Sequence, residues 1–220
     1  MSDERLIRVT GKGTLRLTPD TTQLLIQLEA VCPDYGETLL RSARDTDALK
    51  SALQPFGFAR EDLKTLDFSV DTEYESIQEQ GVYRQRFAGY RYRHSMKLDF
   101  PSDNDLLGRL LYALSRCELQ PEFSLSYTVS DPEKAKNELL ALAVRDAAEK
   151  ARVLSRAAEV ELLALQSIDY SKAELSFETR PMNRLMLADC AAPKAARFDL
   201  NIQPDDISLS DTVTMVWEIG

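Results

Sequence analysis

The chain has 220 residues and a net charge of −9, because 36 Asp and Glu outnumber 27 Lys and Arg. Such an acidic balance disfavours nucleic acid and anionic membranes as general partners. Hydrophobic residues at 44%, with 8 Gly and 9 Pro, indicate a globular protein and exclude low-complexity and collagen-like chains. One His and three Cys leave few ways to build a zinc site or a histidine-based catalytic triad.

The N-terminal part of the chain predicts two strands joined by a turn. Residues 5–17 alternate apolar and polar side chains around Gly11 and Gly13, which predicts a long strand with a glycine bend or bulge. A turn at residues 18–20 leads into residues 22–30, which alternate again. We therefore expect these two strands to pair as a hairpin. A phosphate-binding loop at the glycines is disfavoured, because a strand rather than a helix follows them.

The middle of the chain predicts two amphipathic helices and two strands. The first helix occupies about residues 33–55, between a Pro-Asp start and a Pro-x-Gly stop. Its apolar positions are Tyr35, Leu39, Ala43, Leu49 and Leu53. Regular alternation predicts strands at residues 65–74 and 90–100, and an aspartate caps a leucine-striped helix over about residues 103–117. The strand at 65–74 is expected to present on one face Leu66, Phe68, Val70, Thr72 and Tyr74.

The C-terminal part predicts one long helix between strands. A short strand at 123–129 precedes residues 130–133, Ser-Asp-Pro-Glu, which are a strong helix-start signal. The helix that follows runs to about Ala158, and its alanine-rich stripe would let its backbone approach a sheet closely. Alternation predicts further strands at residues 163–170 and 207–219.

These elements predict an α+β fold with an antiparallel sheet. Residues 20–130 read strand, helix, strand, strand, helix, strand, the order of a split βαβ (ferredoxin-like) core. Residues 1–19 and 131–220 are then expected to form a second layer or subdomain, because their apolar faces also need cover. Within a single domain of 1–220, residues 171–200 show no sustained period and are expected to be an irregular excursion.

One basic and aromatic stretch is the candidate partner or ligand surface, and it comprises Arg84, Arg86, Tyr90, Arg91, Tyr92 and Arg93. Proteins that bind single-stranded nucleic acid use such a composition. Antiparallel pairing with the preceding strand would, however, place opposite these arginines the acids Asp67, Asp71, Glu73, Glu75 and Glu79. Cross-strand charge pairing is the preferred interpretation and a protein-partner surface the second, whereas nucleic acid is not expected as a partner.

The remaining candidates for chemistry favour structural roles. His94 lies in phase with Tyr92 and Met96 on the apolar face of its strand, which favours a packed core histidine over a base that activates a cysteine. Absence of CxxC spacing favours buried thiols over a disulfide framework for Cys32, Cys117 and Cys190. We therefore assign no catalytic, cofactor-binding or metal-binding residues.

The N-terminus and the apolar runs indicate where in the cell the protein is located. The N-terminus carries acids where a signal peptide carries bases, and the longest apolar run, residues 139–144, is far shorter than a membrane helix. We expect no membrane span and a cytoplasmic protein. A periplasmic or envelope location is the alternative if a leader has been removed.

Several phrases of the sequence, in order along nearly the whole chain, resemble the SIMPL-domain family, formerly a domain of unknown function. They are IRVTGKG at residues 7–13 followed by TPD at 18–20, GF at 57–58 with EDLKT at 61–65, GYR at 89–91, SDP at 130–132, and VTMVWEI at 213–219. The resemblance implies an assembly or stress-associated module, linked to oxidative-stress tolerance in bacteria and to kinase-pathway signalling in the animal member. It carries over no catalytic residues. Bacterial members are mostly envelope or periplasmic proteins, and many carry a signal peptide, whereas the N-terminal residues here predict none.

Two functional hypotheses follow from the sequence. The first is a non-enzymatic module that forms a homo-oligomer through exposed strand edges or through the irregular segment 171–200. Long strands at both chain ends leave edges that a partner copy can cover. The second is a small-molecule-binding protein or enzyme that uses a cleft between the two subdomains, lined by Tyr90, Tyr92 and His94.

Overall fold

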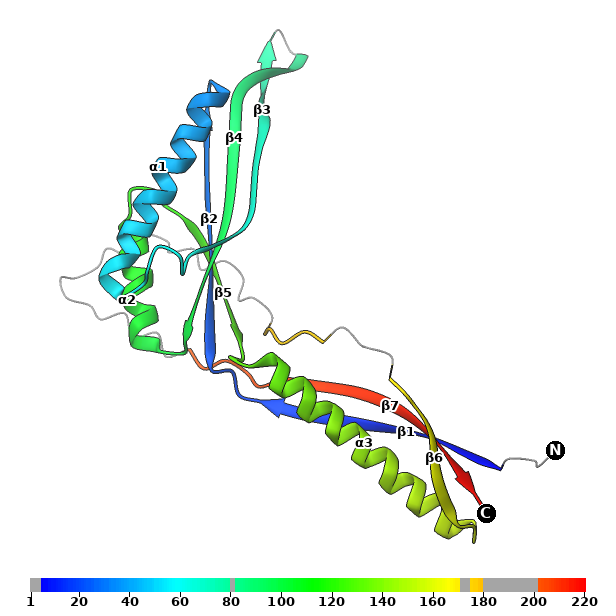
Figure 1. Ribbon diagram of the computed structural model, residues 1–220. Coiled ribbons are helices and arrows are strands. Elements are labelled where there is room, and N and C mark those ends of the chain that lie inside the picture. Colours follow the sequence, from blue (N-terminus) through cyan, green and yellow to red (C-terminus); the bar gives the residue numbers. More distant parts are fainter. Residues whose placement is uncertain (1–4, 80–81, 171–174, 180–201) are drawn as a thin grey trace. The chain divides into compact units, whose positions relative to one another are not determined.

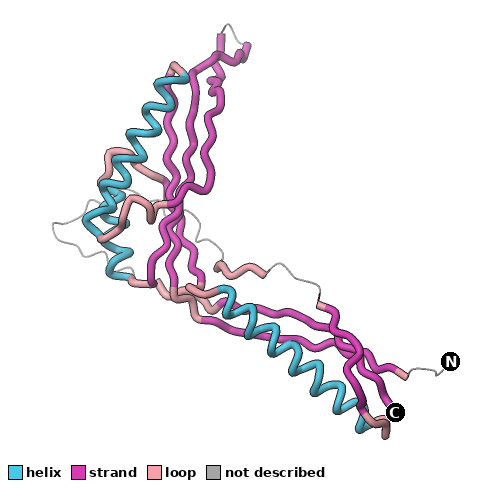
Figure 2. The backbone as a smooth tube through the Cα atoms, viewed as in Figure 1, coloured by secondary structure: helices cyan, strands magenta, loops and turns pink. Residues whose placement is uncertain are grey.

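The computed structural model describes residues 5–79, 82–170, 175–179 and 202–220. They form two compact units: unit 1 draws its described residues from 1–19, 128–179 and 204–220, and unit 2 from 20–127 and 180–203. Each unit is an antiparallel sheet with helix packed on it (Figure 2). The predicted α+β class with antiparallel pairing is confirmed.

Unit 1 is a three-stranded sheet in the order β1-β7-β6, and a single long helix, α3, packs on it (Figure 1). The elements are β1 (Leu6–Leu17), α3 (Pro132–Ala157), β6 (Leu162–Asp169) and β7 (Ile207–Ile219). The Asp131 carboxylate accepts the backbone N–H of Lys134 and so caps α3, as the helix-start signal predicts. The buried stripe of α3 consists of Ala135, Leu139, Ala143, Ala147, Ala151 and Ser155.

Two glycines of β1 allow this helix to lie close to the sheet. A Cβ atom at Gly11 would stand 2.1 Å from the carbonyl oxygen of Ala143 and 2.4 Å from the backbone nitrogen of Ala147. A Cβ atom at Gly13 would stand 2.2 Å from the carbonyl oxygen of Leu139. The pairing of β1 with β7 continues without a shift through both glycines, so the predicted bulge is wrong. These positions lack a side chain because the helix backbone occupies its place.

The predicted hairpin between the first two strands is also wrong. β1 pairs along its full length with β7, whereas β2 (Thr21–Cys32) pairs with β4 (Val82–Pro101) in unit 2. The turn at residues 18–20 therefore passes the chain from one unit to the other. Alternation shows that a strand has a buried face, but it does not identify the strand that supplies the hydrogen bonds.

Unit 2 is a four-stranded sheet in the order β3-β4-β2-β5. Its other elements are α1 (Tyr35–Leu53), a short 3-10 turn (Gln54–Phe56), β3 (Lys64–Glu79), α2 (Asn104–Ser115) and β5 (Glu122–Thr128). Both helices lie on one face of the sheet (Figure 1). We call this the helix face and the opposite side the outer face.

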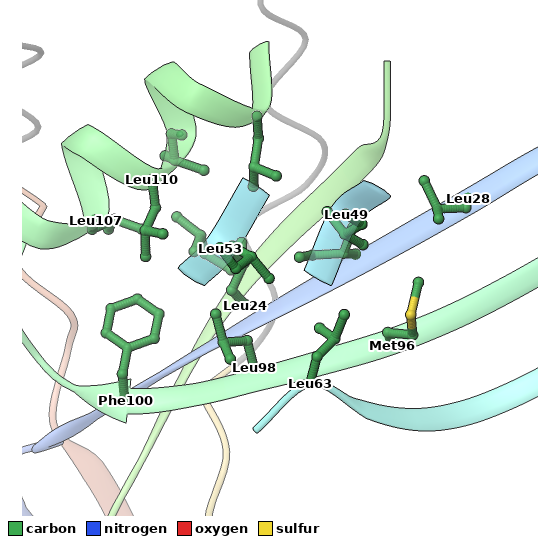
Figure 3. Close-up of a cluster of buried hydrophobic side chains, with 14 of the residues drawn as sticks. Leu24, Leu28, Leu49, Leu53, Leu63, Met96, Leu98, Phe100, Leu107 and Leu110 are labelled. Atoms are coloured by element: carbon green, nitrogen blue, oxygen red, sulfur yellow. The ribbon is translucent and has the colours of Figure 1, made fainter. Parts of the chain in front are cut away.

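A leucine-rich core fills the space between the helix face and the two helices (Figure 3). Leu24 of β2, Leu49 of α1, Leu98 of β4 and Leu110 of α2 are all fully buried in it. The leucine stripe predicted for the second helix is thus confirmed, with Asp103 as its cap.

The first helix buries a different stripe from the predicted one. Leu49 and Leu53 are buried as expected, but Tyr35, Leu39 and Ala43 are exposed. The buried positions in the first half of α1 are instead Thr38, Ser42 and Asp45. Asp45 accepts the hydroxyl of Tyr92 on β4, described below, and Thr38 Oγ1 lies 3.4 Å from the carbonyl oxygen of Tyr90. Polar contacts with β4 therefore outweigh the apolar periodicity in this half of the helix.

The segment predicted to be irregular, 171–200, lies outside the described residues except for 175–179, which form neither helix nor strand. Among the described helices, none combines the length and apolar character needed to cross a membrane.

Candidate functional site

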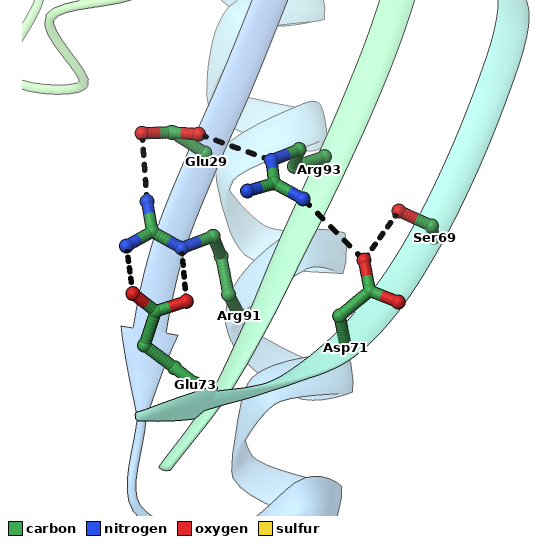
Figure 4. Close-up of polar contacts among 6 residues, drawn as sticks. All are labelled: Glu29, Ser69, Asp71, Glu73, Arg91 and Arg93. Atoms are coloured by element: carbon green, nitrogen blue, oxygen red, sulfur yellow. Dashed lines mark hydrogen bonds and ion pairs between the residues drawn. The ribbon is translucent and has the colours of Figure 1, made fainter. Parts of the chain in front are cut away.

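The outer face of unit 2 carries two of the predicted arginines in a network of ion pairs (Figure 4). Arg91 contacts Glu73 through two hydrogen bonds, from Nε at 2.9 Å and from Nη2 at 2.7 Å, and reaches Glu29 from Nη1 at 3.0 Å. Arg93 lies 3.4 Å from Asp71 and 3.6 Å from Glu29. The two guanidinium groups on β4 therefore bridge carboxylates from both neighbouring strands.

The strand register explains this arrangement. Arg91 stands opposite Asp71 of β3, and Arg93 stands opposite Glu29 of β2. The hydrogen bond from Arg91 holds the pKa of Glu73 below its usual value. Three carboxylates face two guanidinium groups, so the arginines present no excess positive charge for a polyanion. Cross-strand charge pairing is confirmed for these residues.

The rest of the predicted surface divides between the two faces. Arg86 continues the row of pairs by donating from Nε to Glu75 at 2.6 Å, and Arg84 stands opposite Ile77 in the same hairpin. Tyr92 is 1% exposed and belongs to the core. It is therefore not a surface residue, contrary to the prediction, because it alternates with the arginines onto the helix face.

Tyr92 takes part in a buried polar chain between β4 and α1. Its hydroxyl donates to Asp45 Oδ2 at 2.5 Å, and Arg41 Nε lies 3.0 Å from both carboxylate oxygens of Asp45. Burial, followed by the bond to Asp45, raises the pKa of Tyr92 well above its usual value. The phenol therefore remains protonated and serves as a donor to a carboxylate whose charge Arg41 balances.

His94 is held by threonines on both sides. Thr46 donates its hydroxyl proton to the carbonyl of Ser42 at 2.8 Å, so at its 3.0 Å contact it accepts from Nδ1 of His94. Nε2 then accepts from the Thr65 hydroxyl at 2.8 Å. Burial, with a smaller contribution from Lys50, lowers the pKa of His94. The prediction of a hydrogen-bonded core histidine is confirmed, and both ring nitrogens bond to hydroxyls rather than to a cysteine.

Near the β3-β4 hairpin, the predicted surface residue Tyr90 is half-buried and forms a row with three exposed aromatic residues that the sequence did not link to it, Tyr35, Tyr74 and Phe87. The ring of Tyr90 packs edge-on against Tyr35 and Phe87, with 5.4 Å and 5.3 Å between ring centroids, and the centroids of Phe87 and Tyr74 lie 5.9 Å apart. A register shift between Glu73 and Tyr74 sets this row. Gly89 permits the shift, because its φ is +142° and a Cβ atom there would stand 2.4 Å from the carbonyl oxygen of Cys32. In the sequence, the glycine of the Gly89-Tyr90-Arg91 phrase was the available indication of this register shift.

The described residues contain no group of three or more His, Cys, Asp or Glu side chains that could hold a metal ion. Comparison with curated proteins gives no match. The family model of SIMPL, described as "Protein of unknown function (DUF541)", matches residues 7–217. Because that match covers nearly the full length of both units, the chain belongs to the SIMPL family.

Proposed function

We propose that this protein is a non-enzymatic SIMPL-type module that self-associates through β6. The observation that carries the proposal is the apolar surface of this edge strand in unit 1. Leu163, Leu165 and Ile168 are 44%, 45% and 54% exposed. Soluble proteins normally protect edge strands with charges, prolines or a covering element. A second copy that pairs with β6 would cover these side chains and satisfy the outward backbone groups of the strand.

The interior of unit 2 supports a non-enzymatic role. The polar atoms of Asp45, Tyr92 and His94 bond to side chains inside the unit. Such pairs rigidify a core and fix the position of α1 on the sheet.

Three finer points belong to the same proposal. The strand order β3-β4-β2-β5, with α1 and α2 as connections, supports a ferredoxin-like split βαβ core. Free thiols at Cys32 and Cys117 support a reducing, cytoplasmic compartment. The family resemblance supports a task in stress tolerance or signalling.

The test is the solution mass, measured by light scattering after size exclusion at several concentrations. We expect a stable multiple of 24.8 kDa for the natural chain. Replacing Leu165 and Ile168 together by Lys should give a monomer, because two charges would have to be buried in the contact. The matched control is Leu40→Lys, at a position that is 61% exposed on α1 and should leave the mass unchanged. A natural chain that is monomeric at every concentration contradicts the proposal.

A further inference from the structure

One side of β7 in unit 1 is paired over only half of its length. β1 pairs with all of Ile207–Ile219 on one side, whereas β6 pairs on the other side between Thr214 and Ile219. In the described part of the chain, no strand pairs with residues 207–213 on that second side. We call this stretch the open edge of β7. It is long enough to take another strand, because strands commonly contain five or six residues.

The outward backbone groups of the open edge belong to Ser208, Ser210 and Thr212. On β1, the backbone N–H of Lys12 donates to Asp146 of α3 at 2.7 Å, so it points away from β7. Two residues that stand opposite each other in an antiparallel ladder either both bond across the pair or both point away from it. Thr212 stands opposite Lys12, so its N–H points toward the open edge. The period of two along a strand gives Ser208 and Ser210 the same direction.

Tyr170, which directly follows β6, is attached to the open edge through Asp211. The Asp211 side chain stands opposite Gly13, on the side of β7 that faces α3, and is 5% exposed. Its Oδ1 accepts the backbone N–H of Thr212 at 2.7 Å, and its Oδ2 accepts the hydroxyl of Tyr170 at 2.9 Å. The bond to Asp211 raises the pKa of Tyr170, so the phenol remains protonated as the donor. A donor of the open edge is thus satisfied by a carboxylate that Tyr170 holds in place.

Residues 175–179 lie against the start of the open edge. The Phe177 side chain is 8% exposed and packs in one apolar cluster with four side chains of α3 and β7: Ala135, Leu139, Ile207 and Leu209. Lys136 Nζ lies 5.6 Å from the centre of the Phe177 ring, which is a cation–π contact. The chain that follows β6 is therefore attached to the open edge at two points, by Phe177 at its start and by Tyr170 at Asp211.

We propose that Tyr170 and residues 175–179 form a guard that keeps the open edge of β7 from pairing with a second copy of the chain. A two-fold antiparallel pair centred on Ser210 joins the outward backbone groups of both copies. It sets Asp211 opposite Leu209 of the second copy, so no like charges oppose each other. Soluble proteins commonly protect a strand edge by covering it with another segment. This contact is separate from the pairing of β6, so either proposal can fail alone.

The test uses the full-length chain with Leu165 and Ile168 replaced by Lys, so that β6 does not contribute to association. Tyr170→Phe removes the hydroxyl and keeps the ring. We expect it to speed hydrogen exchange of the Thr212 amide about tenfold, the effect of losing one hydrogen bond. Adding Phe177→Ala gives the guard variant. Light scattering after size exclusion should show that the guard variant forms a dimer as its concentration rises.

Two further variants separate the guard from general stability. Val9→Ala removes volume from a side chain that is 5% exposed in the core of unit 1, away from the guard, and should leave the solution mass unchanged. Ser210→Pro, added to the guard variant, removes an N–H from the open edge and should restore the monomer. Because that N–H points away from β1, the proline costs no hydrogen bond within the sheet.

Three results overturn the proposal. The first is a guard variant that stays monomeric at every concentration while the fluorescence of Trp217, in the core of unit 1, shows that this unit is folded. The second is a dimer that persists with Ser210→Pro or also forms with Val9→Ala. The third is an unchanged exchange rate at Thr212 in the Tyr170→Phe chain, and it decides the question even if the guard variant does not fold.

Discussion

The two units solve the same packing problem, helix on antiparallel sheet, with different side chains. In unit 1, α3 lies so close to β1 that Gly11 and Gly13 leave no room for a Cβ atom, and the helix contributes mainly alanines. In unit 2, α1 and α2 are held off the sheet by leucines, and α1 adds a buried polar chain around Asp45. The first contact depends on backbone proximity and the second on side-chain volume and hydrogen bonds.

This difference has a consequence for tolerance to substitution. A leucine core loses stability when volume is removed, because a cavity remains. A glycine-alanine contact loses stability when volume is added, because neither backbone can move aside. The single tryptophan, Trp217, is 7% exposed in the core of unit 1, so its fluorescence reports on that unit.

The largest expected effect is removal of volume from unit 2. Leu110→Ala deletes a side chain that is 0% exposed and should lower the free energy of unfolding by about 4 kcal/mol. Urea unfolding followed by far-UV circular dichroism measures the change. Leu40→Ala, on an exposed leucine, should cost less than about 0.5 kcal/mol. Equal costs for the two variants would refute the assignment of the leucine core.

Addition of one methyl group to unit 1 should be nearly as damaging. Gly11→Ala places a Cβ atom 2.1 Å from the carbonyl oxygen of Ala143, and we expect a loss of about 3 kcal/mol. The measurement is urea unfolding followed by Trp217 fluorescence. Thr10→Ala on the same strand is the control: Thr10 is exposed and bonds to Thr214 across the sheet, so its loss should cost about 0.5 kcal/mol. A Gly11 variant no weaker than this control would contradict the close approach.

The polar chain of unit 2 should show coupling between its members. Asp45→Ala leaves the buried Tyr92 hydroxyl without its acceptor and should cost about 2 kcal/mol. Tyr92→Phe removes the other partner of the same bond. Their double variant should cost less than the sum of the single variants, because the shared hydrogen bond is lost only once. Additive costs, measured by urea unfolding, would show that the bond contributes nothing.

Much of this architecture is predictable from local sequence. Asp103 and Asp131 were identifiable as caps because a cap depends on residues within one turn. The polar stripe of α1 was not predictable, because Asp45 is buried by its bond to Tyr92, a residue 47 positions away. Likewise, a bulge in the pairing of β3 with β4 removes Leu66 from the alternation that the sequence predicts. In the candidate surface, the alternating acids of one strand and arginines of the next predicted the ion pairs of Arg91 and Arg93.

The smallest expected effect is a pH dependence of stability that arises in unit 2. Burial lowers the pKa of His94 in the folded state below the value of about 6.5 that it has in the unfolded chain. Between these two values unfolding takes up a proton, so the free energy of unfolding falls as the pH falls below about 6.5, by at most about 1.4 kcal/mol per pH unit. The loss ends below the folded pKa. The nearby positive charge of Lys50 also lowers the pKa of His94, because it disfavours the protonated imidazole.

The measurement compares urea unfolding of the natural chain and of His94→Gln between neutral and mildly acidic pH. Glutamine retains a donor and an acceptor for Thr46 and Thr65 but does not titrate in this range. We expect the stability of the variant to depend less on pH than that of the natural chain, because the contribution of His94 is lost. The difference should be larger when stability is measured by hydrogen exchange in unit 2 than when it is measured by Trp217 fluorescence in unit 1. If the two proteins lose stability in parallel as the pH falls, carboxylates rather than His94 carry the effect, and the histidine is not the element that distinguishes the two units in acid.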